Sequence, residues 1–198
     1  MFEKYKITLA SASPRRKELL SGLDIQFTVE PSKDESEAYS DDLPWNKVPE
    51  FLARHKSDSF HRKLEGNEVL ITADTLVFLE NENGVMEIIG KPKDAKEAFS
   101  ILRRLSDHTH KVLTGVCIRT NSDSRSFTAS SDVTFGPLSP EEINYYIEKY
   151  KPFDKAGAYG IQEWIGHVAI TNIDGSFYNI MGLPVQRVYR TLREMLGE

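Results

Sequence analysis

The chain has 198 residues, of which 39% are hydrophobic and 28% charged, and its 25 basic and 30 acidic side chains give a formal net charge of -5. This length is typical of one large domain and is enough to bury an apolar core. The acidic balance argues against a general nucleic-acid binder, because domains of that class are usually basic. We therefore expect a single domain over residues 1–198 that binds no nucleic acid.

Cysteine content and hydrophobic runs restrict the class further. Cys117 is the single cysteine of the sequence, so no intramolecular disulfide can form. The longest aliphatic and aromatic run, residues 76–79, is far shorter than the ~18 residues that a membrane span requires. The N-terminus also lacks the pattern of a signal peptide. These features predict a cytoplasmic protein with no membrane partner.

Hydrophobic periodicity divides the first half of the chain into strands and helices. In chain order we expect a strand at 5–10, a helix at 14–20, a helix at 45–64, a strand at 69–79 interrupted at 74–75, and a return strand at 85–89. Ser13 and Pro14 are typical of a helix start, and Gly22 is typical of a helix end. A strand followed by a tight turn and a helix is an arrangement that binds phosphate.

The second half continues with the same kinds of element. In chain order we expect a helix at 95–105, two antiparallel strands at 111–120 and 126–135, a helix from 140 to 150, a loop through Gly157 and Gly160, strands at 167–171 and 177–181, and a helix from 184. Ser139 and Glu142 have the spacing of a capping box. The whole pattern predicts a mixed α/β fold.

Residues 11–17 form the first candidate site. Arg15, Arg16 and Lys17 lie in the first turn of the predicted helix, where positive charge opposes the helix dipole. Free backbone N–H groups, the hydroxyl groups of Ser11 and Ser13, and guanidinium groups would together hold phosphates well. The alternative is a solvated basic helix end that pairs with acidic side chains elsewhere.

Asp74 is the second candidate, because it places a carboxylate within an otherwise apolar strand. An unpaired buried charge is costly, so a cation or a metal ion should compensate it. A general base or a Mg²⁺ ligand fits this position. The alternative is a carboxylate that caps the local backbone at a turn or bulge.

Two loop segments, at 90–92 and 154–162, combine glycines with Lys91 and Lys155. Such glycines allow a ligand to approach the backbone closely, although neither segment matches the dinucleotide or Walker A motif. The five histidines lack metal-ligand spacing. A GxSxG motif is also absent, so a hydrolase triad has no support.

Together these segments resemble the Maf-like nucleoside triphosphate pyrophosphatases. The resemblance runs in order from about residue 7 to residue 187. It is carried by LASASPRRKELL at 9–20, LARHK at 52–56, ADT at 73–75, GKP at 90–92, LRRLS at 102–106, DKAGAYGIQ at 154–162 and MGLP at 181–184. The SPRR and DKAGAYGIQ segments are specific enough to make chance a poor explanation.

The resemblance implies an elongated, two-lobed α/β fold with a mixed sheet and a central nucleotide cleft, shared with the inosine triphosphate pyrophosphatases. It implies hydrolysis of a nucleoside triphosphate to the monophosphate and pyrophosphate, with a divalent cation, Mg²⁺ or Mn²⁺. Such an activity serves a house-cleaning role in nucleotide metabolism. Family analogy also suggests a homodimer.

The resemblance also assigns site residues. Asp74 matches the catalytic carboxylate, and we expect Asp74 and Glu35 to hold the metal ion or align a water. The residues expected to bind substrate are Ser11, Arg15, Arg16, Glu35, Lys56, Thr75, Lys91, Asp154, Lys155 and Gln162. Arg15, Thr75 and Gln162 match residues associated with the branch of the family that prefers dTTP and UTP.

Three functions remain open from the sequence. The first is hydrolysis of dTTP and UTP, extending to CTP or modified pyrimidine nucleotides. The second is the 7-methyl-GTP branch of the same family. The third is a non-enzymatic nucleotide sensor that regulates cell division and would not need Asp74. Departures from the family pattern at Ser57, Thr72, Glu163 and Trp164 leave the fine substrate range open.

Overall fold

The computed structural model describes residues 1–31 and 38–198 and has a mixed α/β fold. The described strands form one seven-stranded sheet in the order β2-β1-β3-β5-β6-β7, with β4 paired to β3. The predicted fold class is therefore confirmed. No helix in the described part of the chain is long and apolar enough to cross a membrane.

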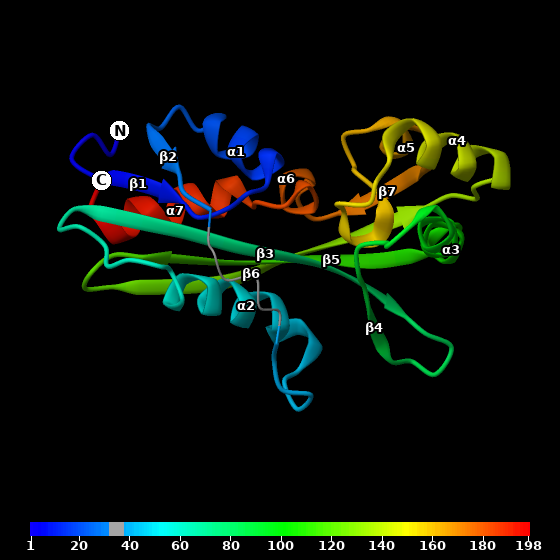
Figure 1. Ribbon diagram of the computed structural model, residues 1–198, viewed down its shortest axis with the longest axis horizontal. Coiled ribbons are helices and arrows are strands. Elements are labelled where there is room, and N and C mark those ends of the chain that lie inside the picture. The colour runs from blue at the N-terminus through cyan, green and yellow to red at the C-terminus, as the bar shows by residue number, and fades with distance from the viewer. Residues whose placement is uncertain (32–37) are drawn as a thin grey trace. The chain divides into compact units, whose positions relative to one another are not determined.

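The first half of the chain carries four of the strands (Figure 1). Its elements in chain order are β1 (Lys6–Leu9), α1 (Pro14–Ser21), β2 (Phe27–Val29), the 3-10 helix η1 (Trp45–Lys47), α2 (Val48–Asp58), β3 (Glu68–Glu80) and β4 (Met86–Ile89). β1 pairs in parallel with both β2 and β3, and β4 pairs antiparallel to β3. β1 is thus an internal strand of the sheet.

The remaining elements complete the sheet and add most of the helices. They are α3 (Ala95–Leu105), β5 (Thr109–Arg119), β6 (Ser124–Phe135), α4 (Pro140–Tyr150), the 3-10 helix η2 (Ala156–Ala158), α5 (Trp164–Ala169), β7 (Ile170–Asp174), α6 (Phe177–Met181) and α7 (Val185–Leu196). β5 and β6 are neighbours in the sheet, and β7 pairs antiparallel to β6.

The chain forms two compact units, each built from separate stretches of sequence. Unit 1 consists of Met1–Asp74, Thr114–Ala129 and Gly182–Glu198, and unit 2 consists of Thr75–Leu113 and Ser130–Met181. β3 passes from unit 1 to unit 2 after Asp74. The prediction of one domain over residues 1–198 stays a prediction.

In unit 1 the sheet is covered on both faces. Figure 1 shows α1 and α7 on one face and α2 on the other. Val69, Leu70 and Ile71 of β3 are accordingly fully buried, as expected for an apolar run in a strand covered on both sides. Gly115 of β5 permits the close approach of α2, because a Cβ there would lie 2.0 Å from the carbonyl oxygen of Pro49.

In unit 2, α3 packs against α4 and η2. Ser139 and Glu142 form the predicted capping box at the start of α4, with the Ser139 hydroxyl accepting from the Glu142 N–H at 3.2 Å. This reciprocal pairing satisfies N–H groups that the first helical turn leaves without partners. The core of the unit includes the fully buried Phe78, Leu102 and Tyr146.

Several sequence predictions about element boundaries are wrong. β3 is one continuous strand, so Asp74 and Thr75 do not interrupt it. The helix predicted at 45–64 is split into η1 and α2 and ends at Asp58. The short strand β2 was not predicted, because its three residues carry no clear alternation.

The end of unit 2 also differs from the prediction. Residues 177–181 form helix α6 rather than a strand. The hydroxyl of Ser176 accepts from the Asn179 N–H at 3.4 Å, and its carbonyl accepts from the Ile180 N–H at 3.2 Å, which starts a helical turn. The strand predicted at 167–171 begins later, at Ile170, because α5 occupies the preceding residues. Periodicity cannot separate a short helix from a short strand.

Candidate functional site

The basic segment before and within α1 is organised around Ser11 in unit 1. Ser11 is 7% exposed, and its hydroxyl accepts from the Ser13 N–H at 3.2 Å and from Nη1 of Arg16 at 3.4 Å. Arg16 also donates from Nε to the carbonyl of Gly182 at 2.9 Å. The structure therefore brings the SPRR segment next to the MGLP segment, which lies far away in sequence.

Asp74 lies at the end of the unit 1 part of β3 and pairs with Lys56 of α2. Oδ1 of Asp74 contacts Nζ of Lys56, and the side chains are 8% and 18% exposed. A carboxylate at this depth needs a compensating charge. Of the two compensating groups expected from the sequence, a cation or a metal ion, the structure shows a cation, Lys56.

Thr72 explains how β3 and α2 come into register at this pair. Its hydroxyl donates to the carbonyl of Ala53 at 2.6 Å. Side chains two residues apart on a strand share a face, and residues three apart on a helix lie one turn apart. The contact of Thr72 with Ala53 therefore places Asp74 next to Lys56. The threonine at position 72, a departure from the family pattern, thus supports the Lys56–Asp74 ion pair.

Most of the charged side chains in this group of unit 1, which consists of Arg15, Arg16, Lys56 and Asp74, are cations. Burial lowers the pKa of Arg16, the charge of Asp74 raises it, and the neighbouring Arg15 lowers it again. Arginine stays charged in proteins, so Arg15, Arg16 and Lys56 against Asp74 leave this group with three positive charges and one negative. Such a group suits an anion with several negative charges.

In unit 2, two predicted segments lie against each other. The Gly157 N–H donates to the carbonyl of Gly90 at 3.1 Å, which joins the loop at 154–162 to the loop that carries Lys91. Gly157 has a φ of 72°, and a Cβ there would lie 3.1 Å from Cγ2 of Val77. Since Thr75 and Val77 share a strand face, the glycine turn packs on the face of β3 that carries Thr75.

Buried aromatic contacts fix the middle of the 154–162 loop. Tyr159 is 6% exposed, and its hydroxyl pairs with Nε2 of the buried His110 at 2.8 Å. Burial lowers the pKa of His110 to about 4, so its ring is neutral at physiological pH. Gln162 of this loop and Lys91 of the adjoining 90–92 loop are exposed. The 154–162 loop is thus fixed at its centre, and the polar side chain of Gln162 is accessible.

Lys155 is held by two carboxylates. Its Nζ lies 2.8 Å from Oδ1 of Asp154 and 3.2 Å from Oε1 of Glu163, and its side chain is 10% exposed. Glu163 also accepts from the hydroxyl of Tyr146. Sequence reasoning noted Glu163 solely as a departure from the family pattern and missed Tyr146. The carboxylate of Glu163, directly after Gln162 in the sequence, was a signal that this residue could hold the turn.

Glu35 lies outside the described residues, so its predicted place at the site stays a prediction. In the described ranges, 1–31 and 38–198, no group of three or more His, Cys, Asp or Glu side chains is arranged to hold a metal ion. Mg²⁺ commonly uses one or two carboxylates together with substrate phosphates. The carboxylate of Asp74, which lies among cations of the kind that phosphate requires, fits a metal ion bound in that way.

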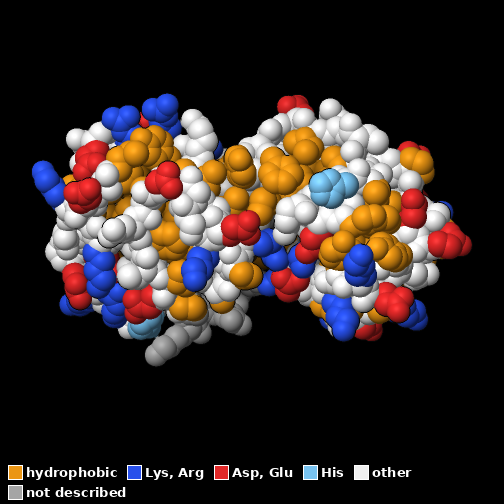
Figure 2. Space-filling view, turned by 90° about the horizontal axis from the view of Figure 1, so that it is seen from above, with side chains coloured by type: hydrophobic (Ala, Val, Ile, Leu, Met, Phe, Trp, Pro, Cys, Tyr) orange, Lys and Arg blue, Asp and Glu red, His pale blue; other side chains and the backbone are white. Residues whose placement is uncertain are grey.

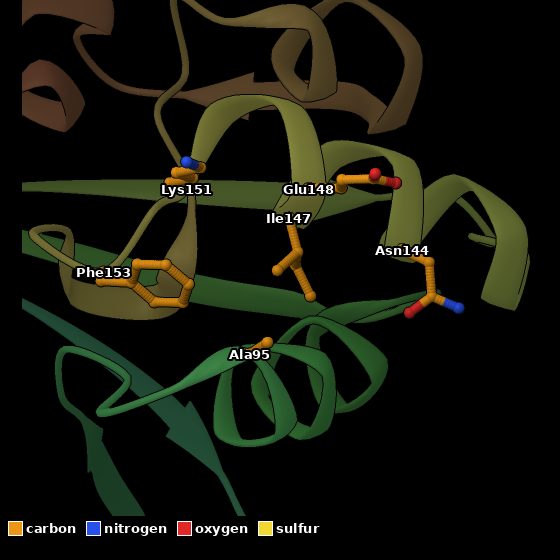
Figure 3. A pocket seen from close by; sticks show the side chains of 6 residues that line it. All are labelled: Ala95, Asn144, Ile147, Glu148, Lys151 and Phe153. Carbon is orange, nitrogen blue, oxygen red and sulfur yellow. The ribbon is translucent and has the colours of Figure 1, made fainter.

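A hollow of about 400 Å³ lies beside α4 in unit 2 and is separate from the predicted site residues (Figure 3). Its lining residues are Ala95, Asn144, Ile147, Glu148, Lys151 and Phe153. One amide, one carboxylate and one ammonium group around an apolar floor do not supply the positive charge that an oligophosphate requires. The candidate site is therefore not this hollow.

Comparisons with known proteins place almost the whole chain in one family. The family described as Maf-like protein matches residues 6–195. A protein of Bacteroides thetaiotaomicron named dTTP/UTP pyrophosphatase is 49% identical over 193 residues, which is 98% of this chain and 97% of that protein. Proteins of the same name from Parabacteroides distasonis and Porphyromonas gingivalis are 51% and 52% identical, covering 96% and 97% of this chain and 96% and 95% of their own lengths.

Proposed function

Because the chain belongs to the Maf-like family, we propose that it hydrolyses dTTP and UTP to the monophosphate and pyrophosphate. The observation that carries this function is the buried Asp74, which is paired with Lys56 and close enough to Arg16 for the two charges to interact. A carboxylate held in this way suits proton transfer, and the surrounding cations suit phosphate. The names of the relatives supply the choice of nucleotide.

Phosphate binding falls to the basic side chains. Arg15 and Arg16 offer planar guanidinium groups that match phosphate oxygens, and Lys56 and the exposed Lys91 act as point charges. Ser11 holds Arg16 in place through its hydroxyl. These groups stabilise the charge that develops on the leaving pyrophosphate.

Asp74 acts as the general base. Its carboxylate takes a proton from a water whose oxygen forms a bond to the α-phosphorus. The bond from the α-phosphorus to the bridging oxygen breaks, and pyrophosphate leaves with the electron pair. Lys56 fixes the orientation of the carboxylate through its contact with Oδ1. A Mg²⁺ ion, when bound, neutralises phosphate charge and lowers the pKa of a coordinated water; Asp74 and Glu35 would hold it.

Base choice falls to Thr75 and Gln162. A hydroxyl group and an amide supply both donors and acceptors, which the edge of a pyrimidine requires. A site built to hydrogen-bond one base edge rejects another base strongly, because its polar groups are then left without partners. This arrangement supports selectivity for UTP and dTTP over purine nucleotides.

The finer assignments follow from the substrate and the surface. Nucleoside triphosphates are the substrates of cytoplasmic metabolism, so we place the enzyme in the cytoplasm.

Val168, Phe177 and Tyr178 of unit 2 are 48%, 40% and 51% exposed, and Figure 2 shows hydrophobic side chains at the surface of the face that carries α5 and α6. Exposed apolar side chains of this kind support a homodimer, which light scattering at two protein concentrations would test.

The activity is tested by counting pyrophosphate separately from orthophosphate. The substrates are UTP, dTTP, CTP, GTP, 7-methyl-GTP and ATP, each with Mg²⁺. We expect pyrophosphate from UTP and dTTP and little from the purine nucleotides. Pyrophosphate from 7-methyl-GTP alone would assign the chain to the other branch of the family. Intact nucleotides throughout would favour a nucleotide-sensing protein.

A further inference from the structure

The carboxylate of Glu163 joins two other buried side chains of unit 2. Oε1 lies 3.2 Å from Nζ of Lys155, and Oε2 accepts from the hydroxyl of Tyr146. Tyr146 is fully buried, and the side chain of Glu163 is 18% exposed. A charge-assisted pair at this depth is strong and directional.

The hydroxyl of Tyr146 has a second partner in the loop. It accepts from the Gly160 N–H at 3.0 Å while its own proton goes to Glu163. Burial and the hydrogen bond to Glu163 both raise the pKa of Tyr146, so the phenol stays protonated and remains a donor. One side chain of α4 therefore holds both ends of the Gly160–Glu163 turn.

The backbone of the turn is closed by a further bond. The Glu163 N–H donates to the carbonyl of Gly160 at 3.0 Å. A Cβ on Gly160 would lie 2.8 Å from Cδ of Glu163, so the carboxyl group packs directly on the turn. Gln162 is exposed within this turn, between the buried Ile161 and the anchored Glu163. Its backbone is thus fixed on both sides, while its amide is accessible.

Lys155 also helps to hold Glu163 in place. An ammonium group has three donors, and Asp154 and Glu163 account for two of them. With two carboxylates around it, Lys155 carries no surplus positive charge for phosphate. It instead neutralises Glu163, whose carboxylate would otherwise be partly buried without a cation.

We propose that Tyr146, Glu163 and Lys155 form a clamp that positions the Gln162 amide for selection of the pyrimidine base. The clamp rests on the proposed function, since it deepens the account of base choice. Its members are positioning residues and do not touch the reacting phosphates. Loss of the clamp therefore changes which base is accepted more than it changes the chemical step.

The test compares kcat/KM for UTP with kcat/KM for GTP in Tyr146→Phe and in Glu163→Gln. Each variant keeps the size of its side chain and removes either the hydroxyl or the charge. We expect the ratio of UTP to GTP to fall at least tenfold in both variants. The matched control is Tyr145→Phe on the same helix, where the hydroxyl is an exposed acceptor for Lys149, and its ratio should match that of the wild type.

A double-mutant cycle with Gln162→Ala makes the test specific. If the clamp acts through Gln162, then Glu163→Gln in the Gln162→Ala background should leave the UTP to GTP ratio unchanged. An equal loss for both nucleotides, or a fall in Tm with an unchanged ratio, would show a merely structural role and overturn the clamp. The wild type is assayed beside both variants. If the wild type releases no pyrophosphate from UTP, the proposed function is overturned, and the clamp with it. If Tyr146→Phe fails to fold, Glu163→Gln alone decides.

Discussion

Lys56 and Asp74 form an ion pair in unit 1, in which the lysine side chain is 18% exposed and the carboxylate 8% exposed. The pair joins the middle of β3 to α2, and Thr72 supports it through a hydrogen bond to Ala53. The contact with Nζ of Lys56 orients one oxygen of the buried carboxylate. This relationship makes Asp74 the residue on which the proposed chemistry depends.

Replacing Asp74 by asparagine should lower turnover by about 10²- to 10⁴-fold, because the amide cannot accept the proton of the attacking water. The fold should persist, since the two side chains have nearly the same shape. Pyrophosphate release from UTP, together with thermal unfolding, checks both expectations. The matched control is Asp132→Asn, which removes the carboxylate of another lysine pair, 2.8 Å from Lys111. Near wild-type turnover in Asp74→Asn would remove Asp74 from the catalytic role.

Replacing Gln162 by glutamate should reduce base selectivity. The change removes the two amide donors but keeps the length of the side chain. Because Gln162 is exposed, the stability of the protein should change by less than about 0.5 kcal/mol. The ratio of kcat/KM for UTP to that for GTP should fall at least tenfold. An unchanged ratio would count against a base contact at this position.

The acid stability of unit 1 should depend on Glu68. This carboxylate is 1% exposed and accepts from Arg62 at 2.6 and 2.7 Å and from Thr8 at 2.7 Å. The pKa of Glu68 is lowered from its ordinary value of 4.5 to about 2, and the hydrogen bonds from Arg62 are the largest cause. The folded state therefore binds the proton less readily than the unfolded state. The resulting stabilisation is present above about pH 4.5 and is lost as the pH falls towards 2.

Urea unfolding at a series of pH values measures this effect. In Glu68→Gln, the free energy of unfolding should fall less steeply between about pH 4.5 and pH 2 than in the wild type. Arg62→Met should cost about 3 kcal/mol near neutral pH, because it removes both guanidinium hydrogen bonds to a buried carboxylate. The control is Arg104→Met, which breaks an exposed pair with Glu87 and should cost less than about 1 kcal/mol. Equal losses in the two arginine variants would contradict this account.

Close packing of β5 against α2 should make Gly115 intolerant of a side chain. A Cβ there would lie 2.0 Å from the Pro49 carbonyl oxygen, so Gly115→Ala must displace backbone. We expect a loss of about 3 kcal/mol in the free energy of unfolding. Gly66→Ala is the control, because a Cβ there meets no atom within 4 Å. A neutral Gly115→Ala would show that α2 can move away from β5 without cost.

Much of the fold could be predicted from local sequence signals. Ser13 with Pro14 marks the start of α1, the capping box of Ser139 and Glu142 marks the start of α4, and the long apolar run marks β3. These signals act within a few residues, so they appear directly in the sequence. The cationic nature of the SPRR segment was also evident from the sequence.

The remaining features depend on contacts between distant residues. Arg16 bonds to the carbonyl of Gly182, and Gly157 bonds to Gly90, so four segments form two pairs that no local pattern predicts. The partner of Asp74 could not be deduced from residue chemistry, because Lys56 lies on a separate helix. α6 was mistaken for a strand because five residues are too few to display a period.

The most direct test of the central claim is hydrolysis of UTP in water enriched in ¹⁸O, with mass analysis of both products. If Asp74 directs water to the α-phosphorus, the label should appear in UMP and be absent from pyrophosphate. Asp74→Asn should slow the appearance of labelled UMP without moving the label. Label in pyrophosphate would mean attack at the β-phosphorus and would contradict the proposed mechanism.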